Sequence, residues 1–70
     1  MKYAIVIETA PGSNFSAYAP DLPGCVAAGD SPDEVRRNMR EATEFHLEGM
    51  REDGGPIPEP ATQVDYVEVS

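Results

Sequence analysis

The chain has 70 residues, enough for one small domain, and carries thirteen acidic against five basic residues, for a formal net charge of −8. This charge repels phosphates, and one lysine cannot make a basic patch, so we expect no direct binding of nucleic acid. The longest apolar run, residues 3–7, is too short to cross a membrane. A single cysteine, and an N-terminus without a signal-peptide pattern, predict a cytoplasmic protein.

The first third of the chain predicts a β-hairpin. Tyr3–Glu8 is rich in β-branched residues and apolar on both faces, which is typical of a central strand. Pro11–Asn14 has the composition of a turn. Phe15–Ala19 follows as a second strand whose alternate residues, starting from Phe15, lie on one apolar face.

Two turn-forming clusters, Pro20–Gly24 and Gly29–Glu34, enclose a short third strand at Cys25–Ala28. The second cluster is a helix start, because Ser31 suits the N-cap and the proline after it suits the first helical position. Glu34 stands three residues after Ser31, which predicts a capping box. A strand and a helix are therefore joined by a very short connection.

The helix is predicted from about Pro32 to about Asp53, where Gly54 and Gly55 end it. One apolar stripe faces the sheet and an acidic ridge faces away from it. The stripe holds Val35, Met39, Ala42, His46, Gly49 and Met50, with Phe45 at its edge, and the acidic ridge holds Glu41, Glu44, Glu48 and Glu52.

Beyond a stiff connector at Pro56–Pro60, the alternating pattern of Val64–Val69 predicts a last strand. A right-handed crossover would return it beside the first strand. We therefore expect one α+β domain over residues 1–70, in the order β-β-β-α-β, with one helix on one face of a four-stranded mixed sheet. The uncovered face, including Ala4 and Val6, predicts a homo-oligomer, a dimer or a tetramer.

Few residues suggest catalysis. His46 lies within the apolar stripe without a second histidine, so a packed core or interface histidine is favoured over a metal ligand or a catalytic base. Cys25 has acidic neighbours in the sequence, which favours a buried small hydrophobe over a nucleophile. Glu8, Asp21 and Asp30 would hold Mg²⁺ if they converged, but turn stabilisation by the two aspartates is favoured. We expect no enzyme, no metal and no cofactor.

Two features suggest a protein-binding surface. The rigid bend presents Asp21, Leu22 and Pro23, with an exposed leucine expected, and its role is either to turn the chain or to make a pre-ordered contact. The acidic residues Glu44, Glu48 and Glu52 form either a solvated helix face or the electrostatic footprint of a cationic partner. We expect these six residues to bind the partner.

The chain also resembles a known family at residues that these patterns single out. The blocks are Tyr18–Cys25 (YAPDLPGC), Gly29–Glu34 (GDSPDE), Asn38, Glu41-Ala42, Leu47 and Gly55–Pro60 (GPIPEP). In this order and spacing they resemble the HicB-like antitoxin domain over nearly the whole chain. The resemblance implies a partially degraded ribonuclease H-like fold and a type II antitoxin that binds a small basic mRNA-cleaving toxin of the HicA type, blocking its RNA surface or its catalytic histidine.

One departure from the full-length family pattern bears on function. Members that repress their own operon carry a C-terminal DNA-binding domain, and this sequence ends at Ser70 without one. We therefore expect toxin binding without operon binding. Two alternatives stay open: a solitary oligomeric HicB-like domain with another protein-binding or regulatory role, and a metal-dependent nuclease.

Overall fold

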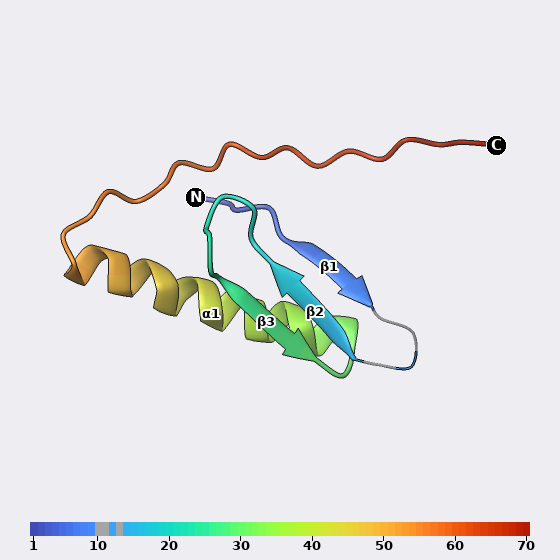
Figure 1. The fold of residues 1–70 in the computed structure, drawn as a ribbon, viewed down its shortest axis with the longest axis horizontal. Helices are drawn as coiled ribbons and strands as arrows, with labels where there is room; N and C mark the ends of the chain where they lie inside the picture. The colour runs from blue at the N-terminus through green and yellow to red at the C-terminus, as the bar shows by residue number, and fades with distance from the viewer. Residues whose placement is uncertain (10–11, 13) are drawn as a thin grey trace.

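In the computed structural model, residues 1–9, 12 and 14–70 are described. Their elements are β1 (Val6–Thr9), β2 (Phe15–Tyr18), β3 (Val26–Gly29) and α1 (Pro32–Glu52). Over the described residues, the three strands form one antiparallel sheet in the order β1-β2-β3, and α1 lies across one face of it (Figure 1). The predicted turn at Pro11–Asn14 includes residues 11 and 13, which lie outside the described residues.

The predicted hairpin is confirmed by the antiparallel pairing of β1 with β2, although β1 starts at Val6 and not at Tyr3. Alternate residues of the second strand divide between two faces, with Ala17 buried and Tyr18 exposed. Tyr18 pairs with Val6 on one side and Val26 on the other. An apolar row therefore crosses the sheet face that α1 leaves open.

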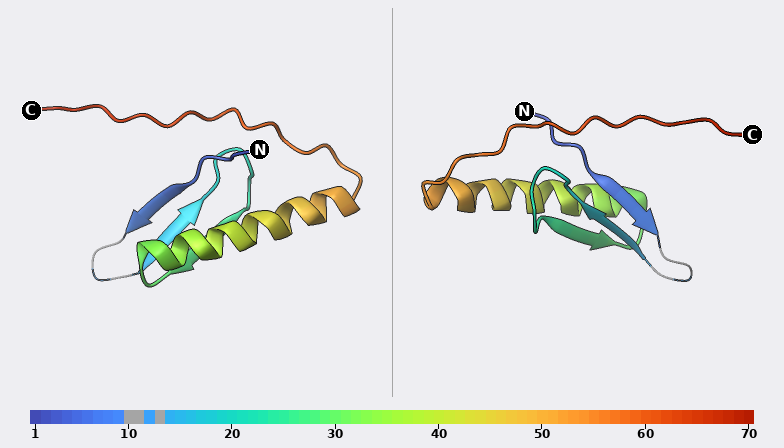
Figure 2. Two further views of the ribbon diagram at one scale, coloured as in Figure 1. Left: turned by 180° about the vertical axis from the view of Figure 1, so that it is seen from behind. Right: turned by 45° about the horizontal axis from the view of Figure 1, so that its top comes forward.

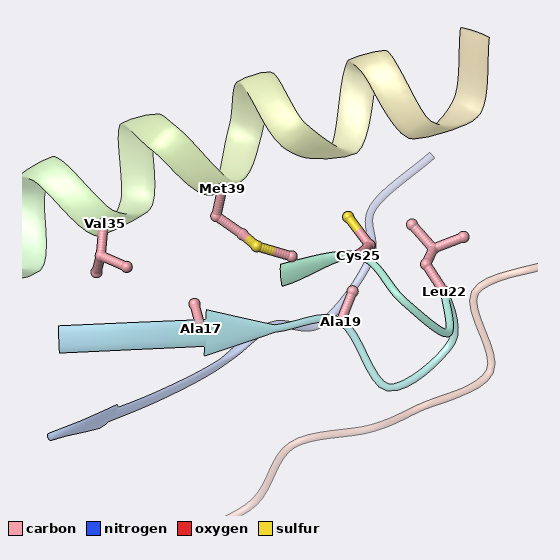
Figure 3. Close-up of a cluster of buried hydrophobic side chains, with 6 residues drawn as sticks. All are labelled: Ala17, Ala19, Leu22, Cys25, Val35 and Met39. Carbon is pink, nitrogen blue, oxygen red and sulfur yellow. The ribbon is translucent and has the colours of Figure 1, made fainter. Parts of the chain in front are cut away.

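The core lies between the sheet and the first half of α1 (Figure 3). Small side chains on the sheet leave room for long ones from the helix and the bend, a combination that close packing requires. The buried hydrophobic residues are Ala17, Ala19, Leu22, Cys25, Val35 and Met39.

The helix begins as the sequence predicts. The Ser31 hydroxyl accepts a hydrogen bond from the Glu34 amide at 3.1 Å, and Pro32 occupies the first helical position. In a capping box the Glu34 carboxylate would accept from the amide of the N-cap, Ser31. Here it accepts instead from the amide of the preceding residue, Asp30, at 3.2 Å. Asn38 then donates to the Ala28 carbonyl at 2.8 Å, which ties α1 to β3.

The end of α1 is a Schellman motif. Gly54 adopts a φ of 72° and donates to the Arg51 carbonyl at 3.1 Å, while Gly55 donates to the Met50 carbonyl at 3.2 Å. The two bonds satisfy carbonyls that the helix leaves without a partner, and the positive φ explains the glycine. Among the described residues, no helix has the length and apolar character needed to cross a membrane.

The predicted fourth strand is wrong for this structure. Val64–Val69 lies outside the sheet, and every residue from Ala61 to Ser70 is exposed. In Figure 2 this segment runs past the N-terminus and away from the strands. Alternation identifies an extended segment, but a ladder also needs an edge within reach, and the proline-rich connector leads this segment off the sheet. The described sheet is consequently antiparallel throughout, not mixed.

Candidate protein-binding surface

The bend between β2 and β3 is a compact turn that holds Leu22 inside the protein. Leu22 donates its amide to the Ala19 carbonyl at 3.0 Å, and its own carbonyl accepts from the Cys25 amide at 3.0 Å. The Leu22 side chain is 0% exposed. The expectation of an exposed leucine is therefore wrong, because a tight turn whose backbone bonds close on themselves directs this side chain into the core (Figure 3).

Asp21 binds another part of its own chain. One carboxylate oxygen, Oδ2, accepts from the Ala61 and Thr62 amides at 3.0 Å each, and Oδ1 accepts from the Thr62 hydroxyl at 2.8 Å. The Thr62 amide, the Thr62 hydroxyl and the Ala61 amide lower the pKa of Asp21 below its ordinary value. Asp21 was expected to stabilise its own turn or to contact a partner, and in this structure it anchors the C-terminal segment.

Pro23, the third predicted residue of the bend, is exposed and forms one wall of a hollow of about 520 Å³. We call it the bend–helix hollow. Its other walls come from the start of β3 and from the second half of α1. The lining residues are Pro23, Gly24, Cys25, Val26, Ala42, Phe45, His46, Gly49, Met50 and Asp53.

Two apolar side chains at this hollow are unusually exposed. Phe45 is 80% exposed and Val26 is 64% exposed. From the sequence, Phe45 is expected only at the edge of the apolar stripe, and Val26 has no predicted role. The signal available in the sequence was that edge position, since a phenylalanine on the border between an apolar and an acidic helix face is partly uncovered.

The acidic ridge divides between two sides of α1. Glu48 and Glu52 are exposed and follow Phe45 by three and seven residues, so they border the bend–helix hollow. Glu44 pairs with Arg40 at 3.2 Å and lines a different hollow, next to the N-terminal strand. Of the six predicted partner-binding residues, Pro23 lines the bend–helix hollow, and Glu48 and Glu52 are exposed on the side of α1 next to it.

His46 and Cys25 are both parts of the packed wall of the hollow. Cys25 is buried, as predicted, and its sulfur lies 3.7 Å from the Thr43 hydroxyl oxygen. His46 is half-buried, and its buried Nε2 has no hydrogen-bond partner among the described residues. Within the described residues, no three histidine, cysteine, aspartate or glutamate side chains converge where they would hold a metal ion.

A chain of a solved "HicA3 and HicB3 toxin-antitoxin complex" is similar in structure, with a TM-score of 0.73 and 33% identity over 87% of this chain and 70% of that chain. A 14.9 kDa protein from the rep-hol intergenic region of Haemophilus phage HP1 (strain HP1c1) is 39% identical over 67 residues. These cover 96% of this chain but 50% of the phage protein.

Two cellular relatives are closer to this chain in length. A UPF0150 protein of Archaeoglobus fulgidus is 41% identical over 56 residues, which are 77% of this chain and 81% of that protein. Another, from Synechocystis sp., is 30% identical over 56 residues, 80% of this chain and 71% of that protein. The family model described as "HicB_like antitoxin of bacterial toxin-antitoxin system" matches residues 3–70. With the match extending from Tyr3 to the last residue, the chain belongs to the HicB-like antitoxin family.

Proposed function

We propose that this protein is an antitoxin that binds and neutralises a small basic toxin of the HicA type. The observation that carries the proposal is the family match over residues 3–70, together with the structural similarity to a chain of the HicA3 and HicB3 complex. The net charge of −8 supports a cationic partner, because long-range attraction speeds the encounter of oppositely charged proteins.

The bend–helix hollow is the surface that we assign to the toxin. It combines the exposed side chain of Phe45 with the carboxylates of Glu48 and Glu52 beside it on α1, while Val26 borders the hollow from β3 with its side chain in the row of the open sheet face. Aromatic anchors in a concave site supply most of the binding energy at protein interfaces, and bordering charges select the partner.

Neither catalysis nor DNA binding by this domain forms part of the proposal. The acidic charge of the chain disfavours phosphate contacts. Metal-dependent nucleases use convergent carboxylates, and the described residues contain no such group. We therefore expect a purified sample neither to cleave RNA with Mg²⁺ or Mn²⁺ nor to shift its own promoter DNA in a mobility assay.

The test is co-expression with the small basic protein encoded beside this chain's gene, followed by growth measurement and co-purification. We expect the toxin alone to arrest growth and the pair to grow and co-purify. Phe45→Ser, which removes the exposed aromatic ring from the hollow, should weaken co-purification and rescue. Tyr18→Ser is the matched control, since Tyr18 is an exposed aromatic residue on the open sheet face and does not line the hollow.

Three results would count against the proposal. Growth arrest that the antitoxin does not relieve would remove the neutralising role. Equal binding by wild type and Phe45→Ser, with loss in Tyr18→Ser, would move the toxin site to the open sheet face. A harmless neighbouring protein that does not bind would favour the second candidate, a solitary HicB-like module with another protein-binding role.

A further inference from the structure

A second hollow lies on the opposite side of α1, between the helix and residues 1–5, the segment that leads into β1. Its volume is about 500 Å³, and we call it the β1 trough. Apolar side chains form its floor, with Tyr3 and Ile5 on the strand side and Met39 and Leu47 on the helix side. The full lining is Met1, Tyr3, Ile5, Arg36, Met39, Arg40, Thr43, Glu44, Leu47 and Arg51.

The β1 trough opens beside a sheet edge that has no strand partner among the described residues. β1 is the outermost strand of the β1-β2-β3 sheet, and it pairs on one side only, with β2. An unpaired edge presents backbone donors and acceptors that can accept another strand. A strand added outside β1 would extend the sheet and place alternate side chains over the trough.

The charge at the rim of the trough is opposite to that of the whole protein. Arg36, Arg40 and Arg51 line it with one acid, Glu44, so the lining carries a net positive charge in a chain of net charge −8. Arg36 and Arg40 are paired with Asp33 and Glu44 on the exposed surface of α1, and Arg51 has no ion pair among the described residues. A basic toxin is disfavoured there by like charge. The trough instead suits an extended segment that alternates apolar and acidic side chains.

The C-terminal tail, residues 63–70, has this chemistry. Its four large apolar residues, Val64, Tyr66, Val67 and Val69, are 58–89% exposed. Because strand side chains alternate, one face of the tail carries Asp65, Val67 and Val69 and the other carries Val64, Tyr66 and Glu68. Either face offers two apolar groups for the trough and one carboxylate for its arginines.

The tail does not fill the trough of its own chain. The Tyr3 hydroxyl donates to the Pro58 carbonyl, and Asp21 holds Ala61 and Thr62, so the position from which the tail departs is fixed. Three prolines in residues 56–60 stiffen the preceding connector. Beyond Thr62 the tail leaves the body of the molecule (Figure 1), and no described tail residue lines the trough. Eight extended residues reach about 26 Å, enough to pair with another molecule.

We propose that the tail of one copy pairs with the β1 edge of a second copy and covers its β1 trough, reciprocally, in a two-fold dimer. Each chain gives one tail and receives one, so the contact closes without open ends. The exchange buries the exposed apolar tail, pairs an exposed sheet edge and brings tail carboxylates to trough arginines. This interface lies apart from the bend–helix hollow, so a dimer formed in this way leaves the bend–helix hollow of each copy available to toxin.

The direct test is NMR on a one-to-one mixture of isotope-labelled and unlabelled protein. Filtered experiments then report contacts between chains only. We expect contacts from the methyl groups of Val64, Val67 or Val69 to the side chains of Tyr3 and Ile5. The same contacts found only within one chain would show that the tail folds back onto its own edge, and would overturn the proposal.

A variant pair tests the energetics by light scattering. Tyr66→Asp combined with Val67→Asp puts a charge on each face of the tail, so it acts whichever face covers the trough. Both residues are exposed in the single chain, which should therefore still fold. We expect the dimer dissociation constant to rise at least about 100-fold, because each of the two tails would place a charge where an apolar side chain is buried.

Phe45→Asp is the matched control, since it puts the same charge on an exposed apolar residue of the bend–helix hollow. It should leave the dimer intact. A monomer of wild-type protein at several hundred micromolar would overturn the proposal. So would a dimer that dissociates in Phe45→Asp but not in the tail variant. Neither readout requires a toxin, so this inference and the proposed function can fail separately.

Discussion

Asp21 and Thr62 lie 41 positions apart in the chain and are joined by two hydrogen bonds. Oδ2 of Asp21 accepts from the Thr62 amide at 3.0 Å, and Oδ1 accepts from the Thr62 hydroxyl at 2.8 Å. With the bond from the Ala61 amide, this carboxylate links the bend after β2 to the start of the tail. One side chain thus sets where the tail leaves the domain.

We expect Asp21→Asn to release this attachment while the domain stays folded, because an amide has one acceptor oxygen and no charge. Hydrogen exchange should become faster at the Ala61 and Thr62 amides and change little in α1. Glu59→Gln is the control, since it removes one negative charge from the connector without touching these amides. Unchanged exchange at both amides in Asp21→Asn would contradict the assigned role.

The same attachment should depend on pH. The hydrogen bonds from Thr62 and Ala61 lower the pKa of Asp21 below its ordinary value of 3.8. A group with a lowered folded-state pKa stabilises above the unfolded value and loses that contribution as the pH falls through the folded value. The attachment should therefore be complete at neutral pH and be lost only below pH 3.8. The chemical shifts of the two amides, followed during an acid titration, measure this, and a midpoint above that value would contradict it.

Leu22→Ala should act on the stability of the domain and not on a partner contact. The side chain is fully buried, and truncating a buried leucine costs about 3 kcal/mol through lost burial and a residual cavity. That is a large share of the stability of a 70-residue domain. Urea unfolding at equal protein concentration measures this change in the free energy of unfolding. The control is Pro23→Ala at the neighbouring exposed residue, which should cost about 1 kcal/mol or less. A similar loss of unfolding free energy in Leu22→Ala and Pro23→Ala would contradict the role of Leu22 as a core residue.

Two glycines should respond to alanine with opposite signs. A Cβ on Gly29 would stand 2.7 Å from the Val35 amide nitrogen, where the backbone at the start of α1 has no room to move, so Gly29→Ala should destabilise by about 1–3 kcal/mol. A Cβ on Gly49 would meet nothing within 4 Å, and alanine in a helix is favoured by about 1 kcal/mol. Gly49→Ala should thus raise the urea midpoint, and a fall in both variants would contradict the free space assigned to Gly49.

Local rules were sufficient for the hairpin, the third strand and the helix. The Ser31 cap, Pro32 and the two glycines after Asp53 each act within a few residues, so the sequence predicts them correctly. The buried position of Val35 follows in the same way from periodicity. That of Cys25 follows from acidic neighbours in the sequence, which favour a small buried hydrophobe over a nucleophile.

The errors concern contacts between distant segments. Leu22 was expected to be exposed because a bend is normally at the surface, but its direction depends on how the turn closes over the core. Asp21 meets Thr62 only through the path of the connector, which no local pattern encodes. Val64–Val69 has the alternation of a strand, but its place in a sheet depends on which edge it can reach. That Pro23 and Phe45 line the same hollow was missed for the same reason.

The charge at the border of that hollow should control how fast the toxin binds. Glu48→Gln with Glu52→Gln changes the net charge from −8 to −6, and so does the control pair Glu8→Gln with Glu59→Gln. Charges near a binding surface mainly raise the association rate, while buried apolar contacts set dissociation. Surface plasmon resonance with immobilised toxin should show slower association for the first pair than for the second, with similar dissociation rates.

The difference between the pairs should shrink as salt is raised, because the screening length falls from about 10 Å at 0.1 M to about 3 Å at 1 M. Phe45→Ser should show the opposite pattern, with faster dissociation that persists at high salt. If both glutamine pairs slow association equally, net charge alone attracts the toxin and the border of the hollow has no special role. If neither does, the acidic ridge is a solvated helix face, and the apolar residues of the hollow must account for binding without it.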